Sequence, residues 1–394
     1  MNKEAAYLLH LLKNFIEESK PEARKDVDWE EMIRLANIHS VTGILGYMVM
    51  KLLLESTAGV SGMMRNQCLK YVRIFAQRAE LMKKRMDQMN ALGIDHLLFK
   101  GYVVRAFYPV PELRSFGDID FLIRPEDRAK SHKLMLEEGF ELKTDWEPVF
   151  SYVKDSEFYE IHTDVMEVDV SDKADYKGYF KQIWDHARRV KEHTWELTPE
   201  FHFLYLLTHI AKHISGSGAG IRMYLDIAAF IRHYGDSLNW DWVAGELQKL
   251  SLADFANVVL QVTERWLGAK SPLPLRAVPE KVLEDFMDFT MEGGVFGYVN
   301  RDAGVITLKR EERNAENVAR HSALLHRAFP SAGSLESRYT YLQNRHWLLP
   351  VAWVHRFVRT RDAWEQHRQE AKSILSVDSE KVVKLKRIYK EIGL

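Results

Sequence analysis

A short stretch between residues 97 and 123 limits the possible folds more than any other part of the chain. It consists of a buried strand that ends at Lys100-Gly101, a helical segment, and a second strand that opens with Asp118 and Asp120. Because successive side chains of a strand point to opposite faces, these aspartates share one face and their apolar neighbours share the other. Adjacent carboxylates that lose their hydration repel each other. A cation usually compensates for this repulsion, and Mg²⁺ that also binds phosphates is a common example.

Residues 91–170 alternate strand-like and helical patterns, whereas most of the chain has helical periodicity. The predicted elements are strands at His96–Phe99 and 118–123, helices at Gly101–Tyr108 and Glu126–Gly139, and a hairpin of segments near 147–153 and 157–166 around Asp155-Ser156. In the last segment Glu160, His162 and Asp164 share one face. The order of elements therefore predicts a small α/β unit.

The flanking parts of the chain are predicted to be helical. Periodic apolar positions predict a helical region at residues 1–90, a helical domain at 171–290 and a C-terminal helical region at 291–394. The last region contains a tight turn at Gly293–Gly297 and a charged stretch at 301–335, which we expect to be partly helical and mobile. The predicted fold class is α+β, with a small mixed sheet embedded in a predominantly helical chain.

Composition argues against several classes of partner. The chain has 55 Lys and Arg residues against 56 Asp and Glu residues, so no overall field favours a nucleic acid or an anionic membrane. Cys68 is the only cysteine, which excludes an intrachain disulfide, suggests a reducing compartment and fits a small core residue. The most apolar run, Ile44–Leu54, is too short to span a bilayer, and the N-terminus reads as an amphipathic helix instead of a signal peptide. We expect a cytoplasmic protein.

Three interpretations of Asp118 and Asp120 compete. The first is a two-metal site for phosphoryl or nucleotidyl transfer, in which both carboxylates hold Mg²⁺ (or Mn²⁺) ions. Such a site needs a third carboxylate on an adjacent strand, and Glu160 is placed for that role. Donors for a triphosphate are also required. The candidates are Lys100, the backbone N–H of Gly101 and Arg114.

The other two interpretations give the pair different roles. An Asp-x-Asp glycosyltransferase would also hold a metal–nucleotide-sugar complex, but it would normally place a nucleotide-binding α/β domain before the pair, where this chain is helical. In the structural interpretation the aspartates cap a turn or pair with Arg105, Arg114 or Arg124. The Lys-Gly turn upstream and the Glu-x-His strand downstream favour the metal site over both alternatives.

His162 lies beside Glu160 and has two possible roles. It is either a general base for an acceptor hydroxyl, because the ordinary pKa of histidine lies near the working pH, or a hydrogen-bond partner of a metal-bound carboxylate. The sequence favours neither role over the other.

His209 and His213 are four residues apart and share one helix face, as zinc ligands can. Asp226 or His202 is conceivable as a third ligand, but neither has a convincing spacing. A core or supporting role, such as orienting Arg222 or Asp226 toward the α/β unit, is therefore favoured.

The C-terminal tail mixes aromatic and basic residues, namely Trp347, Trp353, Arg356, Arg359 and Arg361. Such a mixture could contact RNA or a membrane surface, although a solvated helical face is its usual role.

Several of these segments together resemble a known family, the uncharacterised nucleotidyltransferases, which belong to the superfamily that shares the DNA polymerase beta palm. The segments are Phe99-Lys100-Gly101, Tyr108-Pro109, Arg114, Asp118-Ile119-Asp120 and Glu160-Ile161-His162. The resemblance extends from about residue 30 onward through Leu197-Thr198-Pro199-Glu200, His209, Arg222, Asp226 and Gly294–Gly297.

The resemblance implies a palm of four or five strands, inserted between helical segments, with a metal-dependent NTP site. It assigns the metal-binding pair to Asp118 and Asp120 and the third acidic position to Glu160. Lys100-Gly101 takes the place of the Gly-Gly or Gly-Ser turn of the superfamily. Position 102 departs from the pattern, because it is Tyr instead of a small residue, and its bulk could narrow the phosphate pocket.

The predicted activity is transfer of a nucleoside monophosphate from an NTP such as ATP to a hydroxyl-type acceptor, with release of pyrophosphate. The acceptor is a small molecule, a peptide or a protein, since the near-neutral charge disfavours a long nucleic acid. The main alternative is a catalytically silent nucleotide- or partner-binding regulatory protein that kept the palm. The three acidic positions favour the active enzyme.

Overall fold

The computed structural model describes residues 1–52, 58–115, 117–155, 157–166, 170–216, 218–294, 325, 328–335, 339–343, 345–359, 368, 372 and 379–394. The chain divides into two compact units. One comprises Met1–Asp145, Val149–Val299 and Ile392–Leu394, and the other comprises Trp146–Pro148 and Asn300–Glu391. Ser156 of the predicted hairpin turn, residues 295–297 of the glycine-rich turn and residues 301–324 of the charged stretch lie outside the described residues.

The described chain contains a seven-stranded mixed sheet with the strand order β3-β4-β5-β2-β1-β7-β6. Its strands are β1 (His96–Leu98), β2 (Ile119–Ile123), β3 (Glu141–Trp146), β4 (Val149–Lys154), β5 (Glu157–His162), β6 (Ala187–Lys191) and β7 (Thr194–Leu197). The inner strand β2 is antiparallel to β1 and parallel to β5. The mixed sheet within a mostly helical chain confirms the predicted α+β class.

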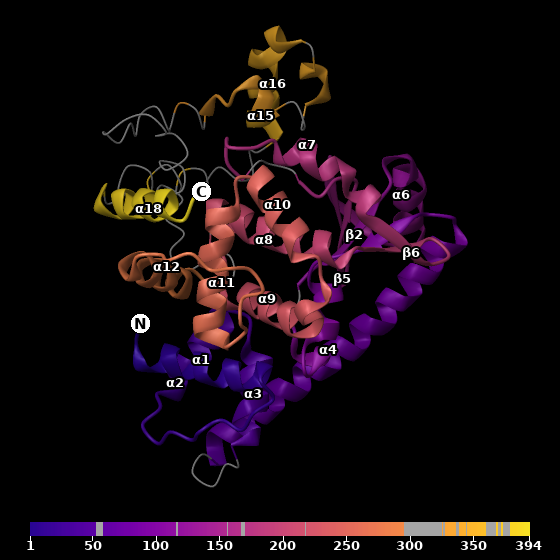
Figure 1. The fold of residues 1–394 in the computed structure, drawn as a ribbon. Coiled ribbons are helices and arrows are strands. Elements are labelled where there is room, and N and C mark those ends of the chain that lie inside the picture. Colours follow the sequence, from indigo (N-terminus) through magenta and orange to yellow (C-terminus); the bar gives the residue numbers. More distant parts are fainter. Residues whose placement is uncertain are drawn as a thin grey trace. The chain divides into compact units, whose positions relative to one another are not determined.

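Helices make up most of the remainder of the first unit (Figure 1). Those described are α1 (Lys3–Ile16), α2 (Trp29–Ile38), α3 (Thr42–Lys51), α4 (Ala58–Ala91), α5 (Gly101–Val104), α6 (Arg128–Glu137), α7 (Tyr176–Phe180), α8 (Pro199–Gly216), α9 (Ile221–Tyr234), α10 (Trp240–Lys249), α11 (Ala253–Leu267) and α12 (Glu280–Gly293). The side chains of Asn2 and Asp28 accept hydrogen bonds from the first free N–H groups of α1 and α2, which explains where these helices begin. The helices predicted in the first 90 residues are confirmed.

Side-chain alternation along β2 gives the sheet an apolar face and a polar face. Phe121 and Ile123 are fully buried in a core with Met89 of α4 and Met135 of α6, so these two helices cover the apolar face. In Figure 1 the long helix α4 extends from α3 to the strands. Asp120 projects from β2 on the opposite face of the sheet.

The prediction was wrong for residues 187–197, which we expected to be helical. They form the hairpin of β6 and β7, whose second strand pairs in parallel with β1, so the sheet exceeds the four or five strands implied by the family resemblance. Strand β3, at the opposite edge, was not predicted either. Both edge strands are rich in charged residues, which discourage pairing with other chains and remove the apolar alternation by which a strand is recognised.

The second unit contains short helical segments around a small apolar cluster. Its described helices include α15 (Ala332–Leu335), α16 (Leu349–Arg359) and α18 (Ser379–Glu391). The cluster consists of Leu335, Tyr339, Leu342 and Ala352.

The aromatic and basic residues of the predicted tail surface have different environments. Trp347 is 77% exposed, whereas Trp353 donates a hydrogen bond to the carbonyl of Pro330 and Arg356 donates one to the carbonyl of Ala328. Arg361 lies outside the described residues, and contact with RNA or a membrane stays a prediction.

Cys68, in α4, is buried as a free thiol, in agreement with the predicted core position. Among the described helices, none combines the length and the apolar character that a membrane span requires.

A buried histidine joins three helices of the first unit. His39 follows α2, is fully buried, and accepts a hydrogen bond at Nδ1 from the backbone N–H of Ile221 (3.2 Å), the first residue of α9. Its Nε2 lies 3.1 Å from the carbonyl oxygen of Met291 in α12 and donates to it. This arrangement needs the neutral imidazole, and burial accordingly lowers the pKa of His39 to about 4.

The neutral His39 predicts a loss of stability in acid. The unfolded chain binds a proton near pH 6.5 and the folded chain only near pH 4, so the free energy of unfolding falls as the pH decreases through this window. Between pH 7 and pH 5, His39 should contribute a loss of about 2 kcal/mol. We expect His39→Asn, whose amide oxygen can still accept from Ile221, to show a correspondingly smaller loss in urea unfolding at the two pH values. Equal losses in both proteins would contradict the assignment.

Candidate active site

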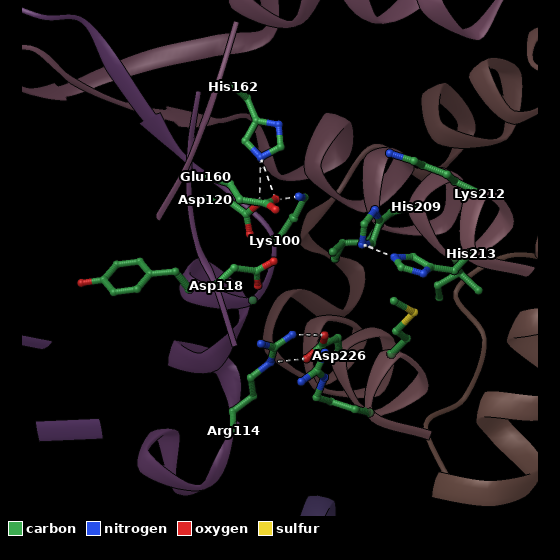
Figure 2. Close-up of a pocket in the computed structure, with 16 residues that line it drawn as sticks. Lys100, Arg114, Asp118, Asp120, Glu160, His162, His209, Lys212, His213 and Asp226 are labelled. Carbon is green, nitrogen blue, oxygen red and sulfur yellow. Dashed lines mark hydrogen bonds and ion pairs between the residues drawn. The ribbon is translucent and has the colours of Figure 1, made fainter. Parts of the chain in front are cut away.

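A cavity of about 220 Å³ brings the predicted site residues together. It is lined by Lys100, Gly101, Arg114, Asp118, Asp120, Glu160 and His162. Side chains of α8 and α9 line the opposite wall. Figure 2 shows the acidic residues on the sheet side of the cavity and His209, Lys212 and His213 on the side of α8.

The parallel register of β2 and β5 brings two of the acids together. Asp120 is the direct partner of Glu160, and Leu122 is the partner of His162, so both carboxylates project from the same face. The ligand atoms of Asp120, Glu160 and His162 all lie within 4.8 Å of one another. Asp118, immediately before β2, faces the same cavity. The predicted common face of the two aspartates is therefore present.

Asp120 is the most strongly held of the three acids. It is 8% exposed, and its Oδ1 accepts hydrogen bonds from Lys100 Nζ (2.5 Å) and His162 Nε2 (2.9 Å). Burial alone would raise the pKa of Asp120, but the charge of Lys100 and the His162 hydrogen bond outweigh it and hold the pKa well below its usual range. Asp120 is therefore an anion at any physiological pH.

Asp118 lies in a different environment, although it is only two residues away. Its side chain is exposed, but partial loss of hydration beside the cavity raises the pKa of the carboxylate above the usual value. The negative charges of Asp120 and Glu160 raise the pKa further, while Lys100 acts in the opposite direction. A cation placed between the acids would relieve this repulsion at Asp118.

Arg114 lines the cavity and forms a buried ion pair with Asp226. Its Nε and Nη2 donate to the two carboxylate oxygens of Asp226 in α9, at 3.1 and 2.6 Å, and the hydroxyl of Tyr108 donates to the same carboxylate at 2.7 Å. Arg114 and Asp226 are each less than a tenth exposed. Although burial opposes the charged form, Asp226 raises the pKa of Arg114 above its ordinary value. This bidentate pair fixes the segment before β2 to α9.

Gly101 is the first residue of α5 and lies against Arg114. A Cβ atom at this position would collide with the guanidinium group of Arg114, which its ion pair holds in place. Tyr102, the departure from the family pattern, also borders the cavity, and the guanidinium of Arg105 lies 3.7 Å from the centre of its ring. The turn therefore requires glycine at 101 and tolerates an aromatic residue at 102.

The second wall of the cavity carries the cations Lys212 and Arg222. Lys212 of α8 was not predicted, although it shares a helix face with His209 and His213 at helical spacing. Arg222 of α9 is largely buried, donates to the carbonyl of Ser115 at 3.3 Å, and has a buried Nε with no hydrogen-bond partner. Burial and the nearby Arg114 lower the pKa of Arg222 to about 10, so it is still a cation at neutral pH.

His209 and His213 contact each other through their Nε2 atoms, 3.2 Å apart. Burial, followed by neighbouring positive charges, lowers the pKa of His213 to about 3 and that of His209 well below its ordinary value, so both are neutral at pH 7. Asp226, one conceivable third zinc ligand, is paired with Arg114. Among the described residues the only group of three or more possible metal ligands is Asp120, Glu160 and His162, which disfavours zinc at the histidines.

The structural interpretation, which the sequence already disfavoured, named three arginines as possible partners of the aspartates, and the structure gives these arginines other contacts. Arg124 forms its ion pair with Asp95, Arg114 with Asp226, and Arg105 lies against Tyr102. In the described part of the chain the side chain of Asp118 has no ion-pair partner, and Asp120 pairs with Lys100 and His162.

Comparison with known proteins gives one match. The model of a family described as uncharacterised nucleotidyltransferase matches residues 25–268, which is more than half of the chain and includes all seven strands. No curated protein and no solved structure matches.

The buried Arg114–Asp226 pair predicts a clear pattern of stability effects. Arg114→Met and Asp226→Leu should each lower the free energy of unfolding by about 3–5 kcal/mol, because each leaves a buried charge without its partner. The double variant should lose much less than the sum, because no unpaired charge remains. Arg265→Met, which breaks an exposed bidentate pair with Glu280, should cost about 1 kcal/mol or less. Denaturant unfolding of the four variants would measure these values, and additive losses at positions 114 and 226 would refute the coupling.

Proposed function

We propose that this chain, which belongs to the uncharacterised nucleotidyltransferase family, transfers a nucleoside monophosphate from an NTP to a hydroxyl-type acceptor and releases pyrophosphate. The observation that carries the proposal is the register of β2 and β5, which sets Asp120 beside Glu160 with Asp118 at the same cavity. The family match favours nucleotidyl transfer over the Asp-x-Asp glycosyltransferase alternative.

The acidic residues fit a divalent metal ion. They offer carboxylate oxygens, which Mg²⁺ and Mn²⁺ prefer, and Asp120 Oδ2 accepts no hydrogen bond from any described residue. In the proposal Asp118, Asp120 and Glu160 hold Mg²⁺ (or Mn²⁺). A bound ion would neutralise charge on the phosphates and polarise the acceptor oxygen.

The phosphates of the NTP lie, in this proposal, between the Gly101 turn and the wall formed by α8 and α9. Among the described residues, Arg114 and Arg222 share one buried carboxylate, that of Asp226, so this part of the cavity has an excess of positive charge that an anion relieves. Arg222 and Lys212 contact the β- and γ-phosphates. Lys100 and Arg114, which the sequence suggested as direct donors, act by fixing the carboxylates with which they pair.

The reaction follows from these positions. The acceptor oxygen forms a bond to the α-phosphorus, the bond from that phosphorus to the bridging oxygen breaks, and pyrophosphate leaves toward Arg222 and Lys212. The acceptor proton passes to water at the mouth of the cavity, where Asp118 is exposed.

His162 is a positioning residue in this scheme. Its Nε2 is hydrogen-bonded to Asp120 and lies 3.5 Å from Glu160 Oε2, and the side chain is 5% exposed. These contacts support the role of a carboxylate partner over that of a general base for the acceptor. A single buried cysteine also fits the proposed cytoplasmic location.

Substitution of the acids tests the proposal. Asp120→Asn and Glu160→Gln should each lower nucleotidyl transfer by about a thousandfold or more, because each removes a charge that the metal site needs. Glu157→Gln, on the same strand but not among the residues that line the cavity, should keep full activity. The assay supplies labelled ATP, GTP, CTP and UTP with cell extract and records which species gains the label.

Two results would argue against the enzyme. A fully active Asp120→Asn protein would exclude the proposed site. Metal-dependent NTP binding by the unmodified chain, without label transfer to any acceptor, would support the silent regulatory protein instead.

A further inference from the structure

We propose that Lys100 takes the place of one of the two metal ions of the site, so that the chain uses a single divalent ion held by Asp118, Asp120 and Glu160. This inference rests on the proposed function and makes its metal requirement specific. It differs from the two-metal arrangement that the sequence suggested.

The contacts of Asp120 limit the number of ions. In a two-metal site a bridging carboxylate gives one oxygen to each ion, and the ions lie about 4 Å apart. Here Asp120 Oδ1 already accepts hydrogen bonds from Lys100 Nζ at 2.5 Å and from His162 Nε2 at 2.9 Å. Only Oδ2 has no hydrogen-bond partner among the described residues. One oxygen is therefore available to an ion, and an ammonium group occupies the other.

The backbone conformation of Lys100 is unfavourable for a residue with a side chain, which indicates that the turn needs the lysine side chain. Lys100 has φ 55° and ψ −138°, a conformation that glycine adopts without strain and that a residue with a side chain rarely adopts. It lies between the end of β1 and the start of α5. A glycine at this position would form the same turn without strain. The contact of the lysine ammonium with Asp120 therefore offsets the backbone strain.

The surroundings of Lys100 hold its side chain in place. The side chain is only 17% exposed, and its Nζ lies 4.9 Å from the ring centre of Phe99. Its Nζ contacts Oδ1 of Asp120. Lys100 therefore places an ammonium group at the position where Asp120 would otherwise meet an ion.

The charges of the cavity favour one ion over two. The three carboxylates carry three negative charges, Lys100 carries one positive charge, and one divalent ion supplies the remaining two. A second ion would have to displace the Lys100 ammonium from Asp120. With two bound ions, the positive charges of the ions and of Lys100 would exceed the negative charges of the three carboxylates before any nucleotide arrives.

Counting Mn²⁺ ions on the full-length chain tests the inference without an activity assay. Bound Mn²⁺ is measured by electron paramagnetic resonance and by calorimetry, first without nucleotide and then with α,β-methylene-ATP, which cannot release pyrophosphate. The unmodified chain should bind one Mn²⁺ in both conditions, without the spin coupling of an ion pair. Lys100→Gly, which suits the backbone, and Lys100→Met, which keeps the side-chain length, should each bind two Mn²⁺ ions with spin coupling.

Lys100→Arg is the matched control, because it keeps the positive charge and should bind one Mn²⁺. Far-UV circular dichroism would show whether each variant is folded. Lys100→Gly relieves the backbone strain at this position, so its ion count can be interpreted even if Lys100→Met loses structure. A coupled pair of Mn²⁺ ions in the unmodified chain would overturn the inference and leave the proposed function intact. The same is true if the lysine variants bind one ion. No bound Mn²⁺ in the unmodified chain would overturn both.

Discussion

The parallel pairing of β2 with β5 is the constraint on which the site depends. It places Asp120 level with Glu160, and a shift of one residue would turn Glu160 into the apolar core. The register is fixed from the other face of the sheet, where Phe121 pairs with Ile161 and Ile119 with Tyr159, all of them buried. Packing on the apolar face thus determines the chemistry on the polar face.

Two buried charge networks meet at the turn after β1. In one, Lys100 and His162 hold Asp120, and in the other, Arg114 and Tyr108 hold Asp226. The two networks meet at Gly101, because the guanidinium of Arg114 occupies the space that a Cβ atom would need. A buried charge without a partner is costly, so each network stabilises the fold only while it is complete. The geometry of the acids is consequently linked to the attachment of α9.

The sequence predicted the three acids of the site but not the long-range ion pair that attaches the segment before β2 to α9. The common face of Asp118 and Asp120 follows from strand alternation, and Glu160 was found because its own strand has the same pattern. The partner of Arg114 could not be predicted, since Asp226 lies 112 residues away and any nearby acid would have satisfied the charge. Edge strands β3 and β6 were missed because they carry the charged residues of an exposed edge and lack the alternating apolar residues of a core strand.

Because of the wall formed by α8 and α9, the cavity has an acidic side and a basic side. His209 and His213 are neutral at pH 7 because burial and the surrounding cations oppose their protonation, so the positive charge of this wall comes from Lys212 and Arg222. A polyphosphate is attracted to these cations directly and to the acids only through a metal ion. The sheet alone would keep the acids and lose Lys212 and Arg222. The proposed activity therefore needs the sheet and the helices α8 and α9 together, although the recognisable acidic motif lies on β2 and β5 and directly before β2.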